Sequence, residues 1–171
     1  TPINGEMIDL GRIGELGKHG VLALLSDSTN AERKGYTMSE RTVGATFDSI
    51  FENSNKRIFV ATFASNIHRV QQIINAAVKF GRKVAVSGRS MENVLSAAIE
   101  LGHMNIPENT LISIDEVGRY PKEQIVIVTT GSQGESMAAL SRMAADVHRK
   151  ITIMPNDTVI FSSSPIPGNE K

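Results

Sequence analysis

The chain has 171 residues, of which 40% are hydrophobic and 21% are charged, and none is cysteine. This length predicts one globular domain with a sizeable core, while the lack of cysteine excludes disulfides and thiolate metal sites and favours a cytoplasmic location. Eighteen Lys and Arg residues balance 18 Asp and Glu residues, so no overall positive charge attracts nucleic acid, and no apolar run is long enough to predict a membrane partner.

Residues 1–20 are rich in glycine and predict a lead-in segment with at most one short helix, around Asp9–Leu16. Short runs of strand-forming residues follow, and they predict strands at Val21–Leu25, Arg57–Thr62, Lys83–Val86, Gln124–Thr129 and Thr158–Phe161, with a further short strand at Leu111–Ile114. Apolar residues at three-to-four spacing lie between these runs, and they predict helices at Ser39–Phe51, Ile67–Val78, Met91–Leu101 and Ser136–His148.

Strands that alternate with helices are typical of right-handed crossovers in a parallel sheet. The expected fold is therefore α/β and Rossmann-like, with a mainly parallel sheet flanked by helices on both faces. We expect the α/β domain to span residues 21–165 and a tail to span residues 166–171. The loop-like character of both ends suggests a piece of a longer protein.

Small polar residues follow five of the predicted strands, at 26–29, 64–66, 87–90, 131–136 and 162–164. In a parallel sheet these loops would share the carboxyl edge, where open α/β sheets bind their ligands. Each loop alone is explained more simply as the end of a strand and the cap of a helix. Together they favour a phosphate-bearing ligand over an apolar one.

Asp27 follows the apolar run Val21–Leu25 and permits two interpretations. Asp-Ser-Thr-Asn is good Asx-turn chemistry, so the carboxylate could simply stabilise a turn. Alternatively, it could orient a histidine or a metal-bound group. No second carboxylate lies close to it in the sequence, so it cannot support two-carboxylate chemistry alone.

The segment Phe63–Arg69, FASNIHR, is the strongest single candidate for a phosphate site. Ser65 and Asn66 stand at a predicted helix start, with His68 in the first turn. They either cap the helix or bind an anion together with its free N–H groups. The loop Thr129–Ser136 resembles a phosphate loop but lacks the Gly-Lys-Ser/Thr of a P-loop and the G-x-G-x-x-G of a dinucleotide fold.

The remaining histidines are ordinary in context. His19 lies in the lead-in, His103 at a helix end, and His148 in the last turn of a predicted helix, where a cation suits the dipole. No histidine pair has the spacing of metal ligands, and no nucleophile–histidine–carboxylate trio stands out. We therefore predict no metal site in this segment.

Five stretches, in this order, are similar to one known family: LLSDSTNAE, FVATFASNIHR, GRKVAVSGRSM, TTGSQGESMAALSRMA and FSSSPIPGNE. They resemble the β-CASP region of bacterial ribonuclease J, a nuclease of the metallo-β-lactamase superfamily, over nearly the whole chain. The resemblance implies a ribonuclease that cleaves RNA from its 5′ end and internally in RNA maturation and decay. It also implies two divalent metal ions, expected to be zinc, a homo-oligomeric parent, and an RNA channel between the β-CASP and metallo-β-lactamase domains.

The resemblance also assigns roles to individual residues. Asp27 matches the acidic motif that orients an active-site histidine in relatives, and Ser65, Asn66 and Ile67 match a substrate-contacting segment, with His68 adjacent. From the two later loops we predict further RNA-phosphate contacts by Ser132, Gln133, Ser163 and Ser164.

The family's metal-ligand motifs are not found in this chain and are expected before Thr1 and after Lys171. The segment alone is therefore expected to bind no catalytic metal and to cleave no RNA. Two other functions stay open: a phosphosugar-binding or isomerase-type α/β domain, and a module that uses the sheet edge only for protein contacts.

Overall fold

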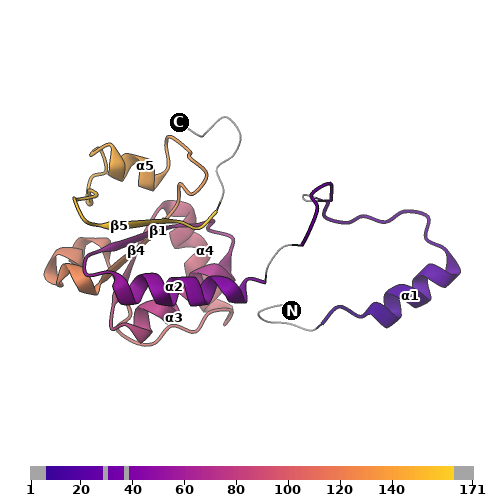
Figure 1. Ribbon diagram of the computed structural model, residues 1–171. Coiled ribbons are helices and arrows are strands. Elements are labelled where there is room, and N and C mark those ends of the chain that lie inside the picture. The colour runs from indigo at the N-terminus through magenta and orange to yellow at the C-terminus, as the bar shows by residue number, and fades with distance from the viewer. Residues whose placement is uncertain (1–6, 29–30, 37–38, 164–171) are drawn as a thin grey trace. The chain divides into compact units, whose positions relative to one another are not determined.

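The computed structural model describes residues 7–28, 31–36 and 39–163, so the predicted contact by Ser164 lies outside the described residues. The chain divides into two compact units, Thr1–Thr42 and Val43–Lys171 (Figure 1). No described helix is both long enough and apolar enough to cross a membrane.

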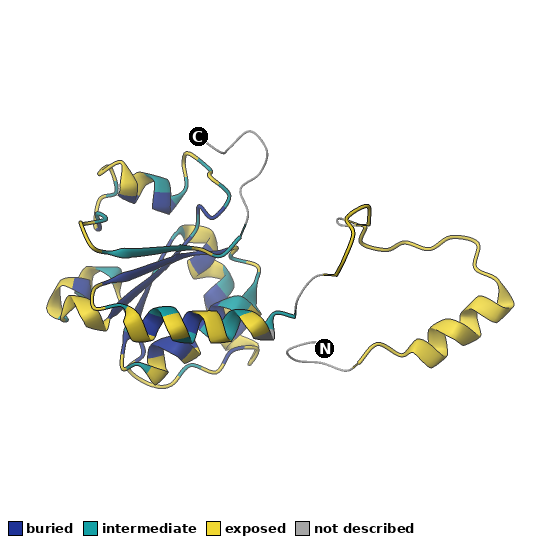
Figure 2. Cartoon of the chain, viewed as in Figure 1, coloured by how far each residue is buried: buried dark blue, intermediate teal, exposed yellow. Residues whose placement is uncertain are grey.

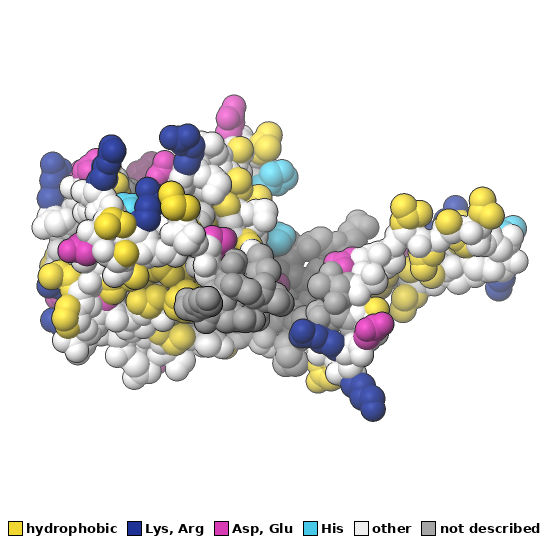
Figure 3. Space-filling model, turned by 90° about the horizontal axis from the view of Figure 1, so that it is seen from above, with side chains coloured by type: hydrophobic (Ala, Val, Ile, Leu, Met, Phe, Trp, Pro, Cys, Tyr) yellow, Lys and Arg dark blue, Asp and Glu magenta, His cyan; other side chains and the backbone are white. Residues whose placement is uncertain are grey.

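The described part of the first unit contains one helix, α1 (Leu10–His19), which confirms the predicted short helix. It begins at Asp9, whose carboxylate accepts a hydrogen bond from the Arg12 N–H at 2.8 Å. Hydrophobic side chains of this unit are exposed at its surface (Figure 3). The strand predicted at Val21–Leu25 is wrong, because this run forms no strand and all its residues are exposed. Strand-forming composition is not sufficient, since a strand also needs a neighbour to complete its hydrogen-bond ladder.

The second unit is built on a five-stranded sheet in which every pairing is parallel. The strand order is β3-β2-β4-β1-β5. The strands are β1 (Ile58–Ala61), β2 (Lys83–Ser87), β3 (Leu111–Ile112), β4 (Ile125–Thr129) and β5 (Thr158–Phe161). The predicted α/β class and parallel sheet are thus confirmed.

Four α-helices belong with this sheet: α2 (Arg41–Asn53), α3 (Ile67–Lys79), α4 (Arg89–Glu100) and α5 (Ala139–Ala144). Two 3-10 helices, η1 (Ile114–Arg119) and η2 (Lys122–Gln124), connect β3 to β4. The helix predicted at Ser136–His148 is much shorter than expected, because residues 131–138 form turns and Asp146 has a φ of +58°. The strand predicted at Leu111–Ile114 ends early, because Ser113 caps η1.

Alternate residues of each strand point to opposite faces of the sheet, which gives the unit two apolar layers. On one face Val60, Val84 and Val126 pack with the apolar sides of α2, α3 and α4. On the other face Phe59 and Ile127 pack with α5 and η1. The central strands β1 and β4 are buried along their whole length, whereas the edge strands β3 and β5 are only partly buried (Figure 2).

The chain direction across the sheet explains this division of the helices. From β1 to β2 to β3 the chain moves one way, and α3 and α4 lie on one face. From β3 to β4 and on to β5 it moves back, and α5 lies on the other face. Right-handed crossovers require this change of face. The neighbouring strands β1 and β4 therefore send their connections to opposite faces, which defines a topological switch point.

Candidate phosphate-binding site

The candidate site lies where β1, β4 and β5 end. Backbone hydrogen bonds hold these ends together, from the Thr62 N–H to the Thr129 carbonyl at 3.1 Å and from the Ser162 N–H to the Ala61 carbonyl at 2.9 Å. The loops that start here begin at neighbouring points on one edge of the sheet. Of the five predicted polar loops, the four of the second unit follow sheet strands at this carboxyl edge.

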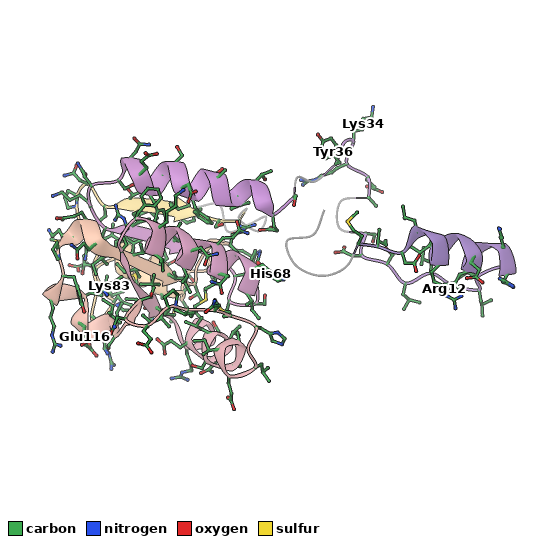
Figure 4. The ribbon with its side chains drawn as sticks, turned by 90° about the horizontal axis from the view of Figure 1, so that it is seen from below. Arg12, Lys34, Tyr36, His68, Lys83 and Glu116 are labelled. Atoms are coloured by element: carbon green, nitrogen blue, oxygen red, sulfur yellow. The ribbon has the colours of Figure 1, made fainter. Side chains whose placement is uncertain are left out.

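The start of α3 supplies the first polar groups. Asn66 is the N-cap, and its Oδ1 accepts a hydrogen bond from the Arg69 N–H at 3.0 Å. This contact turns the carbonyl oxygen of the amide toward the helix and leaves the two Nδ2 donors for other acceptors. Ser65 is exposed, as is His68 (Figure 4), whereas Ile67 is partly buried against the core. Hydroxyl, amide and helix N–H groups together can bind an anion.

The polar groups of the β4 loop are less available to bind phosphate than the sequence suggests. Ser132 is only 3% exposed, and its carbonyl accepts a hydrogen bond from the Ser163 hydroxyl at 2.8 Å. The Gln133 N–H donates to the carboxylate of Glu135 at 2.9 Å. A carboxylate of this chain thus occupies the backbone donor of Gln133, a residue predicted to contact phosphate.

Arg69 links α3 to the end of β5, and sequence reasoning missed it. Its Nη1 donates to the Ser162 carbonyl at 2.7 Å and to the Ser162 hydroxyl at 2.5 Å. The sequence identifies Arg69 only as a polar residue in the first turn of a predicted helix. Nothing local indicates a partner 93 positions away.

A buried hydroxyl lies at the same edge. Thr62, the residue after β1, is 1% exposed, and within the described part of the chain its Oγ1 has no hydrogen-bond partner. An unsatisfied buried hydroxyl costs about 1–3 kcal/mol. Thr129, beside it at the end of β4, is also fully buried. The edge therefore has buried polar residues, Thr62 and Thr129, in addition to the exposed Ser65.

His148 contacts Ser87 at the end of β2. It is not the helix-end cation that the sequence predicted. Its Nδ1 accepts hydrogen bonds from the Ile151 N–H at 3.2 Å and the Lys150 N–H at 3.4 Å. The ring proton must then sit on Nε2, which donates to the Ser87 hydroxyl at 3.2 Å. Burial lowers the pKa of His148, and the charges of Arg142 and Lys150 lower it further. This histidine is therefore held neutral, and it does not activate Ser87 as a base.

No three His, Asp or Glu side chains among the described residues come together as a group able to hold a metal ion. The donors at the sheet edge are hydroxyls, amides and backbone N–H groups, which do not fit a catalytic zinc or magnesium site. Asp27 belongs to the first unit, where it is exposed and the Ser26 hydroxyl donates to its backbone carbonyl at 3.3 Å. It does not follow a strand of this sheet.

These features define a parallel α/β domain whose switch point presents anion-binding groups. A family model described as "Ribonuclease J, beta-CASP domain" matches residues 55–171. The chain is 51% identical over 170 residues to Ribonuclease J of Helicobacter pylori (strain ATCC 700392 / 26695), covering 99% of this chain and 25% of the relative. It is 54% identical over 169 residues to Ribonuclease J 1 of Streptococcus pyogenes serotype M3, covering 99% of this chain and 30% of the relative.

A third relative, Ribonuclease J2 of Bacillus subtilis (strain 168), is 48% identical over 170 residues, covering 99% of this chain and 31% of the relative. The chain belongs to the ribonuclease J β-CASP family, which confirms the resemblance drawn from the sequence motifs. It spans between 25% and 31% of the length of these relatives.

Proposed function

We propose that the edge formed by the ends of β1, β4 and β5 binds the phosphate backbone of RNA. The observation that carries this proposal is the start of α3, where the Ser65 hydroxyl and the Asn66 amide lie at the positive end of a helix at the switch point. Its first turn contains no acidic residue. An anion is therefore favoured there both by the helix dipole and by the absence of a carboxylate in that first turn.

The family supports RNA as the ligand, because the relatives are ribonucleases by name. The parent protein is proposed to be a cytoplasmic, homo-oligomeric ribonuclease that acts from the 5′ end and internally, including in rRNA processing. Two divalent metal ions, expected to be zinc, would supply the hydrolytic chemistry in the metallo-β-lactamase part of the parent. The residues of this segment would bind and orient RNA.

Asp27 is proposed to orient a histidine of that missing part. The apolar side chains that precede it, Leu22, Leu24 and Leu25, are each at least 85% exposed. Exposed apolar surface of this kind favours packing against another part of the protein. The run Val21–Leu25, which forms no strand, belongs to the first unit. The start of the α/β domain at residue 21 stays a prediction.

The test compares two exposed serines near helix starts at the same edge of the sheet. Ser65 precedes α3 and Ser90 lies in the first turn of α4, and both are exposed. In the parent protein Ser65→Ala should weaken binding of single-stranded RNA about 10-fold or more, because a hydrogen bond to a charged group contributes about 1.5–3 kcal/mol. Ser90→Ala should leave the affinity within about twofold. Fluorescence anisotropy across a salt series measures both, and equal affinities for the two variants would contradict the proposal.

The segment alone is proposed to be inactive. Purified free of contaminating nucleases, the 171-residue chain should leave RNA intact with or without divalent metal. Metal-dependent cleavage by this material would show that the proposal is wrong.

The comparisons do not favour a phosphosugar-binding domain. A role limited to protein contacts predicts that RNA affinity does not respond to substitution of Ser65 or Asn66. The binding series above therefore decides between this role and the proposed one.

A further inference from the structure

Arg69 occupies an unusual position for a cation beside a proposed phosphate site. It lies in the first turn of α3, and its own N–H holds the amide of the cap residue Asn66 at 3.0 Å. Its guanidinium reaches away from the helix to the carbonyl and hydroxyl of Ser162, at 2.7 and 2.5 Å. One residue thus contacts both the loop after β1 and the loop after β5.

The contact with Ser162 extends to the third loop. Ser162 is followed by Ser163, whose hydroxyl donates to the Ser132 carbonyl in the β4 loop at 2.8 Å. Fixing Ser162 therefore also restricts Ser163 and, through it, Ser132. The three loops that meet at the switch point are joined by side-chain bonds in addition to the strand ladder.

We propose that Arg69 is a positioning residue, which sets the spacing between the α3 start and the β5 loop and so pre-forms the phosphate site. It acts through Asn66 and Ser162 and does not itself contact RNA. This inference rests on the proposed RNA-binding function. Pre-formed donors bind an anion without the cost of ordering them at the moment of binding, so loss of Arg69 should weaken RNA binding and leave the chemical step unchanged.

The geometry distinguishes positioning from direct contact. The Ser162 carbonyl and hydroxyl are neutral acceptors, and Ser162 carries no charge that could attract RNA. If Arg69 works by holding Ser162, removing the Ser162 hydroxyl should reproduce part of its effect. If Arg69 works by touching phosphate, the two residues should act independently.

The experiment uses the full-length parent protein with Arg69→Gln, Ser162→Ala and the double variant. Steady-state cleavage of a single-stranded RNA oligonucleotide gives KM and kcat separately. Arg69→Gln should raise KM about 10-fold with kcat within about twofold, and Ser162→Ala should raise KM about threefold. In the Arg69→Gln background, Ser162→Ala should have little further effect.

Arg57 offers a matched control. It stands just before β1, at the opposite end from the site, and its guanidinium is also hydrogen-bonded, to Asp157 and to the Thr152 carbonyl. Arg57→Gln should lower thermal stability at least as much as Arg69→Gln and leave KM unchanged. A matching rise in KM with Arg57→Gln would show that Arg69 acts only through general stability.

Two further results would overturn the inference. The first is an unchanged KM in Arg69→Gln, and the second is multiplication of the two single effects in the double variant. If Arg69→Gln does not fold, an unchanged KM in Ser162→Ala overturns the inference, and a raised KM supports it. Failure of the underlying function is recognised separately, because wild-type parent protein would then show no saturable, salt-dependent RNA binding.

Discussion

Substitutions of Asn66 can distinguish its contribution to the stability of α3 from its proposed contact with phosphate. Its Oδ1 caps the helix through the Arg69 N–H, while its Nδ2 donors are the groups proposed to meet RNA. Asn66→Asp keeps the capping oxygen, because aspartate and asparagine are similar N-caps. It replaces the donors with a negative charge, which the helix N-terminus tolerates but phosphate does not.

The expected magnitudes follow from the half-buried position of the side chain. Loss of a hydrogen bond to a charged group costs about 1.5–3 kcal/mol. Repulsion between two unit charges about 4 Å apart adds about 1–2 kcal/mol, since water screens part of the 4 kcal/mol expected at an effective dielectric constant near 20. The total of about 3 kcal/mol corresponds to a loss in RNA affinity on the order of 100-fold.

Two companion substitutions complete the series. Asn66→Ser keeps a capping oxygen and adds no charge, so RNA affinity should fall about 10-fold. Asn66→Ala also removes the cap, which costs about 1 kcal/mol of local helix stability. Amide hydrogen exchange in the first turn of α3 of the parent protein should therefore accelerate in the alanine variant and stay slow in the other two. Retention of RNA affinity within threefold in Asn66→Asp would refute the placement of phosphate at this helix start.

Three other substitutions test separate contacts. Glu135→Gln keeps an acceptor for the Gln133 N–H but removes a negative charge from the edge, so RNA affinity should rise two- to fivefold; an affinity that falls would contradict this. Because burial lowers the pKa of His148, its contribution to stability is complete above the unfolded pKa near 6.5 and is lost as the pH falls through the lower folded value. Protection of the amides at 146–151 against hydrogen exchange, relative to their intrinsic rates, should therefore decrease as the pH falls below about 6.5, and His148→Asn should remove this decrease. Asp157→Asn breaks a pair whose side chains are only 10% and 2% exposed, so unfolding by urea should show a loss of about 3 kcal/mol without a change in RNA affinity.

The strands of the sheet were predictable because composition and environment agree. The runs that became β1 and β4 are rich in valine and isoleucine and are buried on both faces. Val21–Leu25 is also apolar throughout but forms no strand, since composition does not supply the neighbouring strand on which the hydrogen-bond ladder depends. The predicted length of the helix Ser136–His148 was wrong for a different reason. Apolar spacing continues there, but turns before Ala139 and a positive φ at Asp146 confine α5 to Ala139–Ala144.

The candidate site was predictable only where its contacts are local. The cap of α3 joins Asn66 and Arg69, which are three residues apart, and such a cap has a recognisable sequence pattern. The Ser163–Ser132 contact spans 31 positions and the Arg69–Ser162 contact spans 93. Only the strand order β4-β1-β5 brings these residues together, so no local pattern could indicate them.

The topology alone would allow a ligand on either side of β4, because both of its neighbours, β1 and β2, send their helices to the opposite face. The two sides differ in charge and in space. On the β2 side Gly88 packs so closely on Thr130 that an added Cβ would lie 3.0 Å from the threonine hydroxyl, and α4 carries Glu92 in its first turn. On the β1 side α3 has a side-chain cap and no acidic residue in its first turn. A phosphate at the start of α4 would meet the Glu92 carboxylate, whereas the first turn of α3 contains no acidic residue, and this difference favours the β1 side for RNA.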